Sequence, residues 1–143
     1  LCKTVNTLDS MVGYRTERLA DFGRAAARLD DALNWLPARI GGTLICLAAL
    51  PWQGASTTEA FSTMFRHASR HRSPNAGWPE AAMAGALGLA LGGPRRYGGE
   101  MVADGWLGDG RRDAVRADVA RALSLYRLAG MILAVLLLAL ALV

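Results

Sequence analysis

Apolar residues near the start of the chain recur at alternating steps of three and four. This spacing predicts a helix with one buried stripe and an opposite face of exposed charges. The stripe consists of Leu19, Phe22, Ala26, Leu29, Leu33 and Leu36. Pro37 follows it, and because proline lacks a backbone donor and clashes with the preceding turn, we expect the helix to kink or end there.

The first apolar run follows, over residues 35–52. Its 18 residues are at the lower limit of what spans a bilayer about 30 Å thick. Trp35 and Trp52 are suited to anchor its two ends at the membrane interfaces. Gly41, Gly42 and Pro51 interrupt the run, so a re-entrant or half-buried helix remains the alternative to a tilted span.

The last apolar run contains no charged residue from residue 128 to the end. Together with residues 123–126, which precede Arg127, it reaches spanning length, and Tyr126 and Arg127 mark one end. The segment before it is rich in arginine, and positive residues favour the cytoplasmic side. We therefore expect residues 125–143 to cross the membrane, with residues 53–124 in the cytoplasm and Val143 outside.

Between the two runs, residues 59–71 and 113–127 have the apolar spacing of helices, whereas residues 92–99 and 104–112 are glycine-rich and predicted to be loops. The fold class is thus predicted to be all-α, an integral membrane helical protein with amphipathic helices and a large cytoplasmic loop. We expect one membrane domain fragment with four parts: 1–36 with a polar motif and an amphipathic helix, 37–52 as a short apolar or transmembrane segment, 53–124 as the cytoplasmic loop region, and 125–143 as the C-terminal transmembrane helix.

Composition agrees with a membrane protein that carries a polar site. Hydrophobic residues make up 52% of the chain, the mean hydropathy is +0.22 and the net charge is +4. The chain is therefore too apolar for a typical soluble basic protein and too charged for a purely apolar helix bundle. Cys2 and Cys46 lack metal-ligand spacing, and we expect both to be reduced thiols. The chain begins at Leu1 without methionine, and we expect it to be part of a longer protein.

Two polar motifs are candidates for chemistry. The first is KTVNTLDSMVGY at residues 3–14, whose amide, hydroxyl and carboxylate groups suit phosphate or Mg²⁺. The alternative is that Asn6, Thr7 or Asp9 only caps the helix that follows.

The second motif, SPNAGWPE, occupies residues 73–80. Pro74 and Pro79 restrict the backbone, and Pro79 suits the first helical position. Glu80 then falls in the first turn, where the helix dipole favours a negative charge. The small residues that follow would let a helix or a flat ligand approach closely. The alternative is a proline-rich turn that only begins a packed helix.

A basic run, Arg66 to Arg72, leads into the second motif and would favour an anionic substrate. Positive residues at a helix C-terminus, or contacts to lipid headgroups, would explain it equally. His67 and His71 have no third ligand nearby, which argues against zinc. Arg39 lies at the edge of the first apolar run and is expected either to snorkel to headgroups or to face an anionic ligand.

In this order, the blocks KTVNTLDSMVGY, FGRAAARLDDALNWLPAR and SPNAGWPEAAMAGALGLALGGPRRYGG resemble the cobalamin-biosynthesis CobD/CbiB family, the adenosylcobinamide-phosphate synthases. The resemblance covers nearly the whole chain and would correspond to the C-terminal part of a longer integral membrane protein. It implies a ligase that joins aminopropanol or its O-phosphate to adenosylcobyric acid, a corrinoid, through an amide bond. It also implies ATP and Mg²⁺ as cofactors.

Such a reaction needs an activated carboxylate, cations on phosphoryl oxygens and a base that keeps the amine neutral. We expect Asp9 and Glu80 to act as Mg²⁺ ligand or base, and Lys3, the third predicted catalytic residue, to contact phosphate. The expected substrate-binding residues are Asn6, Thr7, Ser73, Asn75, Trp78, Arg28, Arg95 and Tyr97, of which Arg28 and Arg95 would bind phosphate and Trp78 and Tyr97 would edge a groove for the corrin ring. No known nucleotide-binding motif is present.

Location and partners follow from the same resemblance. We expect a multi-pass protein of the inner (plasma) membrane, with its site facing the cytoplasm and in contact with membrane lipid. Other cobalamin-pathway enzymes are possible partners, and no nucleic acid is expected. If residues 35–52 span, however, the two motifs lie on opposite sides, so that segment is re-entrant, the site lies at membrane depth, or only one motif is catalytic. The rival functions are a non-catalytic membrane scaffold or sensor and a transporter subunit.

Overall fold

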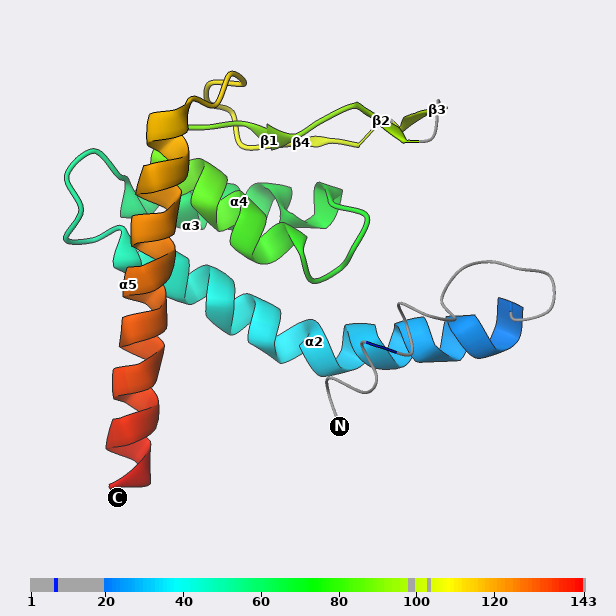
Figure 1. Cartoon of the computed structure of the whole chain (residues 1–143), viewed down its shortest axis with the longest axis horizontal. Coiled ribbons are helices and arrows are strands. Elements are labelled where there is room, and N and C mark those ends of the chain that lie inside the picture. The colour runs from blue at the N-terminus through cyan, green and yellow to red at the C-terminus, as the bar shows by residue number, and fades with distance from the viewer. Residues whose placement is uncertain (1–6, 8–19, 98–99, 103, 143) are drawn as a thin grey trace. The chain divides into compact units, whose positions relative to one another are not determined.

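The computed structural model describes residues 7, 20–97, 100–102 and 104–142 (Figure 1). The chain divides into two compact units, Leu1–Pro37 and Ala38–Val143. Helix α2 (Ala20–Ala48) belongs to both, and the other named elements lie in the second unit.

Helix α2 runs through Pro37 without ending, so of the predicted kink or end at this residue the end is wrong. The lost hydrogen bond is a local cost of about 3 kcal/mol. It is offset here because the residues on either side are mostly good helix formers and the last turns are buried. Leu44, Cys46 and Ala48 are at most 6% exposed and belong to the core of the second unit.

The region predicted as a large cytoplasmic loop contains a packed helical pair. Helix α3 spans Thr57–His67 and continues into a 3₁₀ turn, η1 (Ala68–Arg70); helix α4 spans Gly77–Leu87. Ser56 caps α3, because its Oγ accepts the backbone N–H of Glu59 at 3.2 Å. Gly88 ends α4 in the left-handed conformation (φ 65°), which glycine adopts without steric cost.

Two short antiparallel ladders occupy the stretches predicted as glycine-rich loops. Strand β1 (Leu91–Gly92) pairs with β4 (Trp106–Leu107), and β2 (Arg95–Tyr97) pairs with β3 (Glu100–Val102). The fold is therefore mostly helical rather than all-α. The strands are two or three residues long, too short to produce the alternating pattern by which strands are recognised in a sequence.

Helix α5 spans Arg116–Ala141 and joins the two C-terminal segments that the sequence suggested. In its first turn, Asp118 accepts the Val115 N–H at 2.9 Å and pairs with Arg111 at 2.7 Å. Among the described residues, α5 is the one helix long and apolar enough to cross a membrane, and only 11% of its most apolar window is buried within the protein.

The core of the second unit lies where the end of α2 and helices α3, α4 and α5 meet. It includes Met64, Ala82, Ala86 and Leu125, each at most 2% exposed. Helices α3 and α4 approach each other closely at Gly85, where an added Cβ would lie 2.3 Å from the Glu59 carbonyl oxygen. Helices α3 and α4 can pack this closely only because position 85 has no side chain.

Gly85→Ala is expected to lower the free energy of unfolding by about 1–3 kcal/mol, since the methyl group forces α3 and α4 apart. The matched control is Gly41→Ala in α2, where an added Cβ meets nothing within 4 Å. That substitution should be neutral or stabilising by helix propensity. Thermal unfolding of the complete protein in detergent measures both. Equal effects of the two substitutions would contradict the close packing at Gly85.

Candidate functional site

The second polar motif forms a hydrogen-bonded turn between η1 and α4. The Ser73 Oγ accepts the backbone N–H groups of Asn75 and Ala76, both at 3.3 Å. Helix α4 begins at Gly77, so Pro79 is the third helical residue rather than the predicted first. Its missing N–H still costs nothing, because the first-turn N–H groups have no partner within the helix.

The start of α4 is held against η1 by backbone contact. An added Cβ at Gly77 would lie 2.1 Å from the Ala68 carbonyl oxygen and 2.8 Å from the His71 Cβ. Because Gly77 has no side chain, the start of α4 packs directly against η1. This packing fixes the distance between the two ends of the turn.

Arg39 reaches this turn from α2. Its Nη1 donates to the Asn75 Oδ1 at 3.3 Å, and its guanidinium carbon lies 4.5 Å from the centre of the Trp78 ring. Asn75 is only 7% exposed, while Phe65 meets Trp78 edge-on at 5.9 Å between ring centroids. The planar guanidinium is thus held by a hydrogen bond at its edge and an aromatic ring at its face.

Glu80 has a histidine partner that the sequence analysis did not assign to the site. The Nε2 of His71 lies 3.5 Å from the Glu80 Oε2, and both side chains are partly exposed. The Nδ1 of His71 accepts the Ser73 N–H at 2.9 Å, which leaves the proton of a neutral ring on Nε2, toward Glu80. The nine-residue spacing between His71 and Glu80 follows no helical period, so sequence reasoning had no signal for the pair.

Most of the small residues of α4 are buried and, among the described residues, do not form an open face for a flat ligand. Ala81, Ala82, Ala84 and Ala86 are at most 2% exposed. Gly85 lies against Glu59 and Thr63 of α3. Another helix fills this face, which is one of the two uses that the small residues suggested.

The structure brings together Ser73, Asn75, Trp78 and Glu80 among the predicted site residues. Arg28 is exposed on the part of α2 in the first unit, and Thr7 is also exposed. Other predicted positions lie outside the description: Lys3, Asn6 and Asp9 entirely, and Arg95 and Tyr97 apart from their backbone in β2. The predicted roles of these residues remain predictions.

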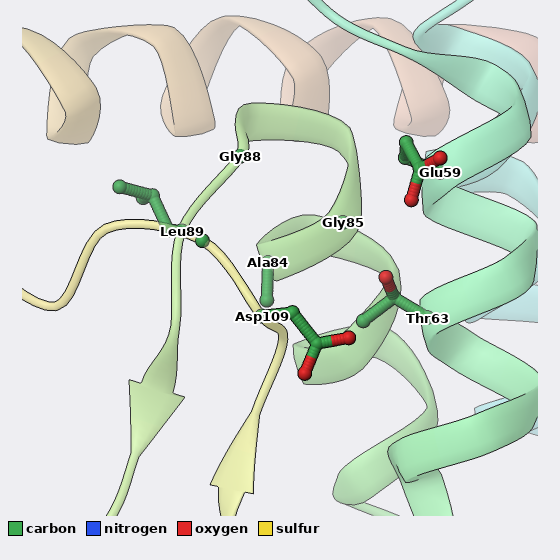
Figure 2. Close-up of a pocket in the computed structure, with 8 residues that line it drawn as sticks. Glu59, Thr63, Ala84, Gly85, Gly88, Leu89 and Asp109 are labelled. Atoms are coloured by element: carbon green, nitrogen blue, oxygen red, sulfur yellow. The ribbon is translucent and has the colours of Figure 1, made fainter.

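Two cavities flank the loop after β4. One, of about 210 Å³, is lined by Glu59 and Thr63, which project from α3, and by Asp109 from the loop (Figure 2). The other, of about 340 Å³, shares Asp109 with it but adds Arg70, Trp106 and Arg112.

His67 lies buried beneath this loop and is 1% exposed. Its Nδ1 accepts the Gly108 N–H at 2.8 Å, while its Nε2 is 3.7 Å from the Asp109 carboxylate. Burial lowers the pKa of His67, and the positive charge of Arg70 lowers this pKa further. His67 therefore acts as a neutral hydrogen-bond acceptor that holds the loop against α3.

Arg39 and Asn75 are expected to be energetically coupled. In a double-mutant cycle of Arg39→Met and Asn75→Ala, each single change leaves a partly buried partner without its bond, so the effects on unfolding should fall short of additivity by about 1–2 kcal/mol. Pairing Asn75→Ala with Arg127→Met, at an exposed arginine of α5, should give additive effects. Thermal or denaturant unfolding in detergent measures both cycles. Additivity in the Arg39 cycle would show that the bond contributes nothing.

Comparison of the sequence with known proteins identifies its family. The model of the CobD/CbiB protein family matches residues 1–126. Cobalamin biosynthesis protein CobD of Brucella anthropi is 54% identical over 126 residues, which cover 87% of this chain and 38% of the relative. The proteins of the same name from Rhodobacter capsulatus and Yersinia enterocolitica are 49% and 47% identical, with 93% and 91% of this chain and 41% of each relative covered.

The chain thus spans about two fifths of the length of these curated relatives. No solved structure matches it significantly. The family match extends from the first residue into α5 and includes the whole turn between η1 and α4. The resemblance inferred from the three sequence blocks is confirmed: the chain belongs to the CobD/CbiB family of cobalamin-biosynthesis proteins.

Proposed function

We propose that this chain contributes part of the site at which the complete protein forms an amide between adenosylcobyric acid and aminopropanol or its O-phosphate. The product would be adenosylcobinamide or its phosphate. Membership of the CobD/CbiB family supports a role in cobalamin biosynthesis. The observation that supports a catalytic site in this chain is the contact between the Glu80 carboxylate and His71 Nε2, at 3.5 Å, on a turn anchored at both ends.

Glu80 is the group best placed to act on the reacting amine. An amine attacks an activated carboxyl carbon only as the neutral base, so a proton must leave nitrogen as the C–N bond forms. A carboxylate at a helix N-terminus is stabilised by the helix dipole and is partly open to solvent here. In this proposal Glu80 accepts that proton, and His71 orients the carboxylate through its Nε2–H.

Arg39 would bind the anionic groups of the reactants. Its charge lies beside the turn, and its orientation is set by Asn75 and Trp78. Asn75 is nearly fully buried, so we assign it the role of holding Arg39 rather than the predicted direct contact with substrate. Ser73 likewise holds the turn through its two accepted N–H bonds.

The described residues fit Mg²⁺ and ATP only in part. They contain no group of three or more histidine, cysteine or acidic side chains that could hold a metal. Mg²⁺ is commonly held by one or two carboxylates together with substrate phosphates, and Glu80 is the described carboxylate at the turn that would serve. When bound, the ion would neutralise charge on phosphoryl oxygens during carboxylate activation.

The proposed location of the protein in a membrane rests on helix α5. This helix is apolar, long enough to span and mostly not covered by the rest of the chain. We propose that it crosses the inner (plasma) membrane with its C-terminal end outside. The turn would then face the cytoplasm, where the positive-inside rule places the arginine-rich segment before α5.

Glu80→Gln is expected to lower the turnover of cobinamide synthesis by about a hundredfold or more, as for loss of a positioned acid–base group. The substitution keeps size and helix position, so thermal stability should change little. The measurement is cobinamide formation from adenosylcobyric acid and aminopropanol by the complete protein, with ATP and Mg²⁺ supplied. Glu59→Gln is the matched control, because Glu59 also lies in the first turn of a helix but outside the motif.

Glu80→Asp separates the two predicted roles. A metal ligand should retain part of its function in aspartate, whereas a base that must reach one nitrogen should lose most of it. Near-normal turnover in Glu80→Gln, with Glu59→Gln also normal, would remove Glu80 from the mechanism and leave the turn with a packing role.

A further inference from the structure

The larger of the two cavities lies away from Glu80, between η1 and the loop after β4. It has a volume of about 340 Å³, and its lining includes two arginines, Arg70 and Arg112, together with Trp106. Neither arginine pairs with a carboxylate in the part of the chain that the structure describes. The nearby Asp109 is instead paired with Arg66 at 3.1 Å.

Trp106 positions both guanidinium groups. The Arg112 guanidinium carbon lies 4.8 Å from the centre of the indole ring, and the Arg70 Nη1 donates to the Trp106 carbonyl oxygen at 3.4 Å. An added Cβ at Gly93 would lie 2.5 Å from the same indole, so the ring itself is tightly held. A guanidinium has five N–H donors, and these contacts use at most one from Arg70.

The charge balance at this cavity is positive. Among the described residues that line it, Arg70 and Arg112 are cationic and Asp109 is the one carboxylate, which is already paired with Arg66. Buried His67 accepts a backbone N–H through its Nδ1 and so adds no charge. Burial is the largest cause of the lowered pKa of His67; the charges of Arg70 and Arg66 lower this pKa further, whereas the charge of Asp109 raises it. An exposed cluster of this kind favours an anion with several acceptor oxygens over a monovalent carboxylate.

We propose that Arg70 and Arg112 form a binding site for a phosphoryl group beside the loop after β4. Planar guanidinium groups bind phosphate oxygens through paired N–H donors, and the cavity is large enough for a small phosphate ester. The phosphate could come from the amine substrate, as aminopropanol O-phosphate, or from a nucleotide. The site's existence is independent of the proposed function; only this choice of ligands rests on it.

Direct titration of the complete protein in detergent with inorganic phosphate tests the site without any turnover. Arg112→Gln and Arg70→Gln are each expected to weaken phosphate binding about tenfold or more, as for loss of a charge-assisted hydrogen bond. Arg112→Lys, which keeps the charge but not the planar fork, should weaken it less. The matched control is Arg116→Gln, at an exposed arginine that does not line the cavity.

Competition then identifies the source of the phosphoryl group. If aminopropanol O-phosphate displaces inorganic phosphate in wild-type protein and loses affinity in Arg112→Gln, the site binds the amine substrate; if ATP does so, it binds the nucleotide. Unchanged phosphate affinity in both glutamine variants, or an equal loss in Arg116→Gln, would overturn the proposal. The phosphate titrations measure binding without turnover and do not depend on Glu80. The phosphate site and the proposed amide-forming function can therefore fail separately.

Discussion

The structure of the second unit depends on the close approach of α3 and η1 to α4 at two glycines. At Gly85 and at Gly77 an added Cβ would lie 2.3 Å and 2.1 Å from carbonyl oxygens of the facing segment. Such distances exclude any side chain, so the two contacts set the separation of the segments at both ends of the pair. The turn that joins them therefore has fixed ends, and its shape follows from that constraint together with the hydrogen bonds to Ser73 Oγ.

A turn with fixed ends can hold charged groups in place without ordering them when substrate binds, which is the main entropic advantage of a preorganised site. His71 and Glu80 leave the turn from its two ends and meet, while Arg39 is held against it from α2. The same pair of helices supports the loop after β4 through buried His67, which accepts the Gly108 N–H. One packing arrangement thus positions both the candidate amide-forming site and the proposed phosphate site.

Sequence patterns predicted the elements that are determined by residues close together in the chain. The uncharged run at the C-terminus marked α5, and Glu80 was placed correctly in a first helical turn. Of the predicted kink or end at Pro37, the end is wrong because burial of the later turns of α2 offsets the local cost of the missing hydrogen bond. Contacts between distant residues gave no local signal: the β1–β4 ladder pairs Leu91 with Leu107, and Arg39 meets Asn75 across 36 positions.

The central proposal is that the turn between η1 and α4 forms part of the site where adenosylcobyric acid is joined to the amine. Hydrogen exchange of the complete protein, with and without adenosylcobyric acid, tests this directly. The account predicts slower exchange at the Asn75, Ala76 and Trp78 amides, which lie in the turn or at the start of α4, and no change in the exposed apolar turns of α5. Protection elsewhere in the protein, with exchange in this turn unaffected by saturating substrate, would contradict it.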